Sequence, residues 1–137
     1  MTEDPGAQQR QPKSHKRSTL NRTVVRQPTP VSRFQDLPRD DGIIFRWMTP
    51  VTGIATDLVI YIDKIDGLEK DEKVELFIWI HEADGVIRKD VKVLPGLNEL
   101  TLELTIPKST RIVITCEQKE GQMLHGIWTS FLFGIKK

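Results

Sequence analysis

Hydrophobic and polar residues alternate with a period of two along most of the chain after residue 42. In residues 54–63, the apolar side chains of Ile54, Leu58, Ile60 and Ile62 fall on one face, and Tyr61 falls on the other with polar residues. Leucines alternate with threonine and glutamate in the same way in residues 100–106. These runs predict strands with one face in a core and one face in solvent.

Further strand-like runs follow one another at short intervals. They cover residues 43–48, 74–81, 86–93, 111–117 and 126–135. Turn sequences with Pro or Gly separate them, such as Asp66-Gly67 and Pro95-Gly96. No long helical pattern lies between them. The sequence therefore predicts an all-β fold, an antiparallel β-sandwich of seven or eight strands that is jelly-roll-like or immunoglobulin-like. The strand order cannot be read from the pattern.

Residues 1–41 have a different composition from the sandwich domain expected over residues 42–137. Between residues 5 and 35 the segment is basic without one acidic residue, and it contains several prolines but few large apolar groups. Such a composition cannot offset the entropy of ordering the chain by itself. We expect an extended N-terminal arm that becomes ordered by docking.

Two short apolar runs mark where the arm would dock. Val24 and Val25 form one run, and Val31 and Phe34 form the other. Both suit addition as strands to the sheet edge of a neighbouring protein. Electrostatic steering is expected from Arg17, Arg22 and Arg26.

An aromatic strip is the leading candidate for an interface. In residues 74–81, aliphatic side chains form one face, while Phe77, Trp79 and His81 line the other, where Tyr61 joins them if the two strands are neighbours. A solvated sheet face does not normally carry such a strip. It can pack against another subunit, stack on sugar rings, or be covered by another part of the same chain. Burial by protein is favoured.

Other residues are assigned to structure. Trp128 lies in an apolar concentration near the C-terminus and is expected in the core or in a seam between subunits, and Trp47 is expected to act similarly. Cys116 is the only cysteine and lies on the apolar side of its run, so we expect a core residue.

Catalytic and metal-binding chemistry is not indicated. The chain has no nucleophile motif and no glycine-rich phosphate loop, so no enzyme activity and no cofactor are expected. The acidic residues Asp63, Asp66, Asp71 and Glu72 are interleaved with lysines and lack the spacing of a calcium loop. The sequence has no signal-peptide-like start and no apolar stretch of membrane-spanning length, so synthesis and folding in a cytoplasm are expected, without a membrane partner.

The strand runs resemble those of the small β-sandwich accessory proteins of tailed-phage particles. The resemblance rests on residues 44–54, 57–62, 95–100 and 126–133. It implies a virion structural protein that decorates or cements a capsid, or sits at a tail or neck. Such a protein would be made in the host cytoplasm, form homo-oligomers and contact other virion proteins such as the major capsid protein.

Two other functions stay open. A carbohydrate-binding module would use Trp79, Phe77 and Tyr61 to stack on sugars and would be a monomer. A nucleic-acid-associated protein would use the basic arm, and its binding would weaken steeply with salt.

Overall fold

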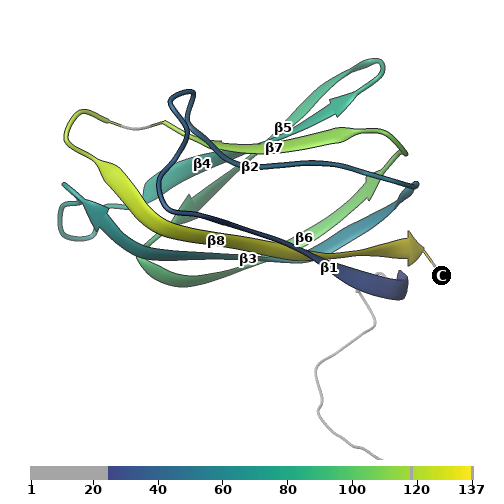
Figure 1. The fold of residues 1–137 in the computed structure, drawn as a ribbon, viewed down its shortest axis with the longest axis horizontal. Helices are drawn as coiled ribbons and strands as arrows, with labels where there is room; N and C mark the ends of the chain where they lie inside the picture. The colour runs from purple at the N-terminus through teal and green to yellow at the C-terminus, as the bar shows by residue number, and fades with distance from the viewer. Residues whose placement is uncertain (1–24, 118, 137) are drawn as a thin grey trace, which may run out of the picture.

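The structure, a computed structural model, describes residues 25–117 and 119–136. Two antiparallel four-stranded sheets pack face to face (Figure 1). Sheet A has the strand order β1-β8-β3-β6 and sheet B the order β2-β7-β4-β5. The strands are β1 (Val25–Gln35), β2 (Ile43–Met48), β3 (Gly53–Asp66), β4 (Val74–Glu82), β5 (Gly85–Val93), β6 (Gly96–Ile106), β7 (Arg111–Cys116) and β8 (Met123–Lys136). The prediction of an all-β sandwich is confirmed.

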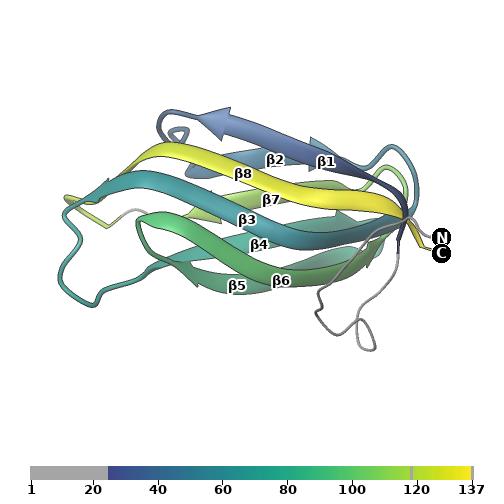
Figure 2. The ribbon, with the colours of Figure 1, turned by 90° about the horizontal axis from the view of Figure 1, so that it is seen from below.

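The strands pair as they would in one long hairpin that is folded over to form the two sheets. The first strand pairs with the last, the second with the seventh, the third with the sixth and the fourth with the fifth. The pairs β3–β8 and β4–β7 then join these ribbons into the two sheets. This arrangement is an eight-stranded jelly roll. Figure 2 looks onto sheet A, with β1, β8, β3 and β6 in order across the near layer.

The sandwich begins earlier than the sequence indicated, because β1 belongs to it. The predicted boundary at residue 41 lies beyond this strand, whose residues pair with β8 of the same chain from Val25↔Lys136 to Gln35↔Ile127. Pro28 and Pro30 are among the prolines of the segment in which the sequence predicts an arm. They are accommodated because β1 is an edge strand, where a residue without a backbone N–H is tolerated.

The core lies between the sheets, and an aromatic cluster joins them at one end. Phe45 and Trp47 of β2 contact Phe131 of β8 edge to face, with ring centroids 5.6 and 5.5 Å apart. Trp47 also contacts Phe133 at 5.0 Å. Edge-to-face pairs of this kind stabilise a core beyond their buried area. Trp47 therefore packs against the core, as expected, and buried Cys116 belongs to it too.

A β-bulge at Asp57 changes which residues of β3 face the core. The pairing with both neighbouring strands shifts between Thr56 and the residues after Asp57, whose φ is 56°. Leu58, Ile60 and Ile62 belong to the core cluster, as predicted, together with Ala55. Ile54 is also buried, at 2% exposure, but it lies outside this cluster. The prediction that Ile54 shares a face with Leu58 is wrong, because a bulge reverses the alternation of faces.

Candidate functional site

Four large apolar side chains form a line across the outer face of sheet A. Phe34, Trp128, Tyr61 and Leu97 occupy directly opposed positions on β1, β8, β3 and β6, and we call them the apolar row. Their exposed fractions are 64%, 39%, 40% and 62%. Directly opposed side chains lie about 5 Å apart at Cβ, so the row is continuous. It spans three strand spacings, about 14 Å.

A shallow depression lies at the β1 side of the row. Phe34, Tyr61 and Trp128 line it, together with the carboxylate-bearing Asp36 and Asp63. Neither carboxylate forms a hydrogen bond or ion pair with another described residue. The depression thus combines an aromatic floor with two free acceptor groups.

Gly126 shapes this depression. Its φ of 64° is in the left-handed region, and an added Cβ would lie 2.8 Å from the Cβ of Asp63. Its N–H donates a hydrogen bond of 2.7 Å to the carbonyl oxygen of Asp36, which ties the end of β1 to β8. A residue with a side chain would displace Asp63 at this point.

The apolar row ends in polar surface along the strands. In the adjacent outward positions, the hydroxyl of Ser32 donates to that of Ser130 at 2.9 Å, and Val59 stands opposite Glu99. The row is therefore a bounded patch with a polar border, which is the usual anatomy of a binding surface.

The predicted aromatic strip lies on the outer face of sheet B. Phe77 and Trp79 are half-buried there, and His81 is exposed. The indole N–H of Trp79 donates to the Thr115 hydroxyl at 2.8 Å. The guanidinium of Arg88 covers both rings, 5.0 Å from the Phe77 centroid and 5.8 Å from that of Trp79. Other residues of the same chain thus cover a large part of the strip.

The structure changes the sequence interpretation of two residues. Tyr61 does not join Phe77, because β3 and β4 belong to different sheets and their outer faces point in opposite directions. Trp128 lies outside the core, so of the two places expected for it only a seam between subunits stays open. It points outward from β8, whereas Ile127 and Phe131 of the same strand are buried. The central position of β8 in its sheet explains why large residues occur on both of its faces.

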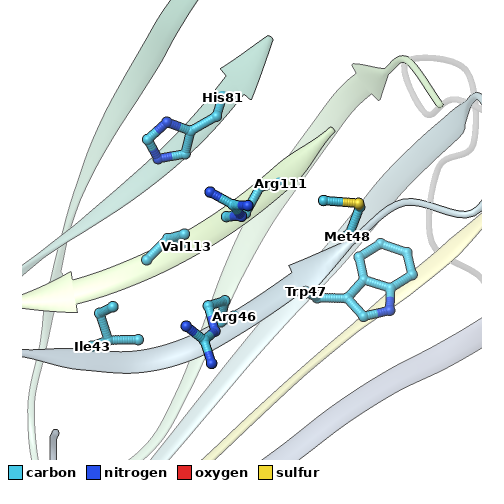
Figure 3. A pocket seen from close by; sticks show the side chains of 7 residues that line it. All are labelled: Ile43, Arg46, Trp47, Met48, His81, Arg111 and Val113. Atoms are coloured by element: carbon cyan, nitrogen blue, oxygen red, sulfur yellow. The ribbon is translucent and has the colours of Figure 1, made fainter. Parts of the chain in front are cut away.

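A second shallow depression lies on sheet B, at its β2 side (Figure 3). Arg46, Arg111 and His81 line it from β2, β7 and β4, with Met48 and Val113 among them. Neither guanidinium forms an ion pair with a described carboxylate. The charge of this depression is therefore uncompensated within the described part of the chain.

The residues expected to dock the arm have separate places. Val31 is buried in the sandwich, whereas Phe34 is exposed in the apolar row. Both belong to β1, which adds to a sheet of its own chain. Arg17, Arg22 and Val24 lie outside the described residues, as do the side chains of Val25 and Arg26.

The remaining polar groups form local contacts. The His125 ring lies 2.6 Å from a carboxylate oxygen of Asp66, and this hydrogen bond lowers the pKa of that carboxyl. Burial raises the pKa of the Cys116 thiol to about 11, which disfavours the reactive thiolate. The described residues contain no group of three or more His, Cys, Asp or Glu side chains that could hold a metal ion.

The apolar row was missed by sequence reasoning. Each member occupies an outward position, but the register that aligns four distant strands is not encoded locally. The only local signals were single large residues, such as Leu97 beside a turn and Trp128 among buried neighbours.

Comparisons with known proteins add no relative. No protein-family model matches the chain, and no curated protein shows significant sequence similarity to it. Within the described residues, no helix is long and apolar enough to cross a membrane.

Proposed function

We propose that this protein is a non-enzymatic structural protein that assembles with other protein subunits through the outer face of sheet A, as an accessory protein of a virus particle does. The observation that carries the proposal is the apolar row, Phe34, Trp128, Tyr61 and Leu97, exposed on one face of a jelly roll. Aromatic residues are enriched at protein interfaces, where a central apolar strip within a polar border supplies most of the affinity.

The placement of the side chains in the row supports a role in binding a partner and not a role in stabilising the fold. Its members come from all four strands of sheet A and point away from the core. Exposed aromatic surface contributes little to the stability of an isolated domain. Its retention in one aligned row fits a surface that is covered in an assembly.

The jelly roll itself does not choose between functions, because capsid proteins and lectins both use it. The virus-particle context rests on the resemblance described above. The basic segment before β1 fits such a setting, since many copies held in one particle multiply weak contacts by effective concentration.

The test is the native mass of the full-length protein by light scattering over a range of concentrations. Tyr61→Ser with Leu97→Ser should shift the protein toward monomer, because both side chains are exposed and can be changed without opening the core. Val51→Ser is the matched control, since Val51 is an exposed apolar residue in the loop before β3. An unchanged mass for the double variant of a self-associating protein would contradict the proposal.

A carbohydrate-binding module is the second candidate, and the depression beside the row favours it. Aromatic rings stack on the apolar faces of sugars, and carboxylates accept hydrogen bonds from hydroxyl groups. Trp128 and Tyr61 would supply the first contact and Asp36 and Asp63 the second. This function predicts that glycans change tryptophan fluorescence and that Trp128→Ala abolishes the change. A response in a protein that remains monomeric would favour this candidate over assembly.

A further inference from the structure

The two outer faces of the sandwich carry opposite charge. The apolar row of sheet A is flanked by three carboxylates, those of Asp36 after β1, Asp63 on β3 and Glu99 on β6. Lys64 lies close by, but its ammonium group is 3.9 Å from Asp66. No arginine or lysine is paired with the three carboxylates in the described part of the chain. This face is therefore apolar with a negative border.

Sheet B presents the opposite arrangement. Arg46 and Arg111 occupy outward positions on adjacent strands (Figure 3). Arg46 of β2 stands opposite Val113 of β7, and Met48 of β2 stands opposite Arg111 of β7. His81 stands directly opposite Arg111 on the next strand. The three basic side chains span two strand spacings, about 10 Å, so they would cover part of the row, which is about 14 Å long.

Two other positive charges on the outer face of sheet B lie beside carboxylates. The Arg88 guanidinium lies 3.0 Å from Asp90 and also covers Phe77. Lys92 stands opposite Glu75 across the β4–β5 pair. Arg46 and Arg111 are therefore the guanidinium groups of this face that have no ion pair among the described residues.

The two surfaces are chemically complementary. Guanidinium groups bind carboxylates through charge-assisted hydrogen bonds and also stack on aromatic rings. Arg46 and Arg111 can form both kinds of contact at the sheet A surface, because Tyr61 and Trp128 offer aromatic rings there and Asp63 offers a carboxylate. Met48, which is half-exposed, supplies an adaptable apolar contact.

We infer that the occupant of the apolar row is the Arg46–Arg111–His81 surface of a second copy of this chain. This inference rests on the proposed assembly function and names its partner. The contact joins sheet A of one copy to sheet B of the next. A two-fold dimer through sheet A would instead place the carboxylates of both copies against each other, which is unfavourable.

The geometry makes the contact head-to-tail. The outer faces of the two sheets are on opposite sides of the sandwich (Figure 1). Each copy therefore offers the apolar row on one side and the Arg46–Arg111–His81 surface on the other. Such contacts close into a ring or continue as a chain, depending on the rotation between copies. A face four strands wide, about 19 Å, and about 30 Å long would bury roughly 570 Å² per copy, or about 1,100 Å² in total, which is close to the lower limit for a specific interface.

A mixing experiment with two variants of the full-length protein tests this directly. In the first variant, Tyr61→Lys and Asp63→Lys disable the sheet A surface. In the second, Arg46→Glu and Arg111→Glu disable the sheet B surface. All four side chains are substantially exposed, and thermal unfolding followed by circular dichroism checks that both variants fold.

Each variant alone should be monomeric by light scattering, and an equimolar mixture should form a dimer that grows no further. The first variant keeps the sheet B surface and the second keeps the sheet A surface, and these two surfaces fit each other. Self-association of the wild type should weaken about tenfold or more when salt is raised from about 0.05 to 0.5 M, because the charges lie at a solvated border.

The outcomes separate this inference from the proposed function. If the sheet B variant alone self-associates like the wild type while the sheet A variant does not, the row still mediates assembly but the head-to-tail contact is wrong. A wild type that stays monomeric up to about 1 mM, a concentration at which even weak contacts of about 4 kcal/mol are populated, also overturns the inference. The function would then require a different protein as partner.

Discussion

Replacing Phe131 by alanine should destabilise the sandwich strongly, and replacing Phe34 should not. Phe131 is 2% exposed and contacts Phe45 and Trp47 from the opposite sheet. Phe34 lies on the neighbouring strand β1 but points to solvent. Comparing the loss of stability in Phe131→Ala and Phe34→Ala therefore distinguishes a phenylalanine packed in the core from one exposed in the apolar row.

The magnitude follows from burial. Truncation of a buried phenylalanine to alanine costs about 3–5 kcal/mol, including the cavity that is left. For Phe34, only about a third of the side chain is covered, so the cost should be about 0.5–1 kcal/mol. One kcal/mol lowers the melting temperature of a domain of this size by roughly 3–6 °C. The expected decreases in melting temperature are about 9–30 °C for Phe131→Ala and about 2–6 °C for Phe34→Ala.

The measurement is chemical denaturation and thermal unfolding of both variants, followed by circular dichroism. If Phe131→Ala fails to fold, Phe131→Leu keeps most of the volume and should still cost about 1–2 kcal/mol through the lost aromatic contacts. A loss below about 1 kcal/mol for Phe131→Ala, or equal losses at both positions, would refute the assignment of Phe131 to the core and Phe34 to the surface.

Four further outcomes are expected. Gly126→Ala should cost about 2 kcal/mol or more in denaturant titrations, because alanine is strained at this φ and its Cβ meets Asp63; wild-type stability would contradict the geometry. Thr129→Val should be neutral or stabilising by up to about 2 kcal/mol, because the fully buried Thr129 hydroxyl oxygen finds no hydrogen-bond partner among the described residues, and a clear loss of stability would point to a partner. Cys116 should react with Ellman's reagent at pH 8 only as fast as the protein opens, since its pKa of about 11 keeps the thiol protonated; rapid reaction of the native protein would disagree. The pKa of Glu72 is lowered by hydrogen bonds from the Glu69 N–H and the Lys119 ammonium. The stability that these bonds contribute is therefore present above the ordinary pKa of 4.5 and is lost as pH falls through the lowered pKa. Amide exchange in the loops that contain Glu72 and Lys119 should quicken in that pH range, and in Glu72→Gln that pH dependence should vanish.

Much of the fold follows from local alternation of residues. The strand containing Leu76, Ile78 and Ile80 is predicted over residues 74–81 and observed over Val74–Glu82, and its core face is predicted correctly, because a half-buried strand needs only period-two patterning. The bulge at Asp57 escaped this reading, since one extra residue reverses the faces without changing the composition.

The candidate site depended on information that no single segment contains. Phe34, Trp128 and Tyr61 are brought together only by the pairing of β1 with β8 and of β8 with β3. The composition around Phe34 favoured an arm, because proline and basic residues are typical of disordered segments. The edge position of β1 allowed the same residues to form a strand.

The pairing of the first strand with the last has a consequence for synthesis of the chain. While the ribosome is still making β8, β1 has no neighbour in sheet A, and β3 has only β6. The central position of sheet A is filled last, by the strand that also carries Trp128, Phe131 and Phe133. Strand pairing between distant segments is slow to form. Nascent chains should therefore expose a wide sheet edge to chaperones until β8 emerges, and then complete the sandwich in one late step.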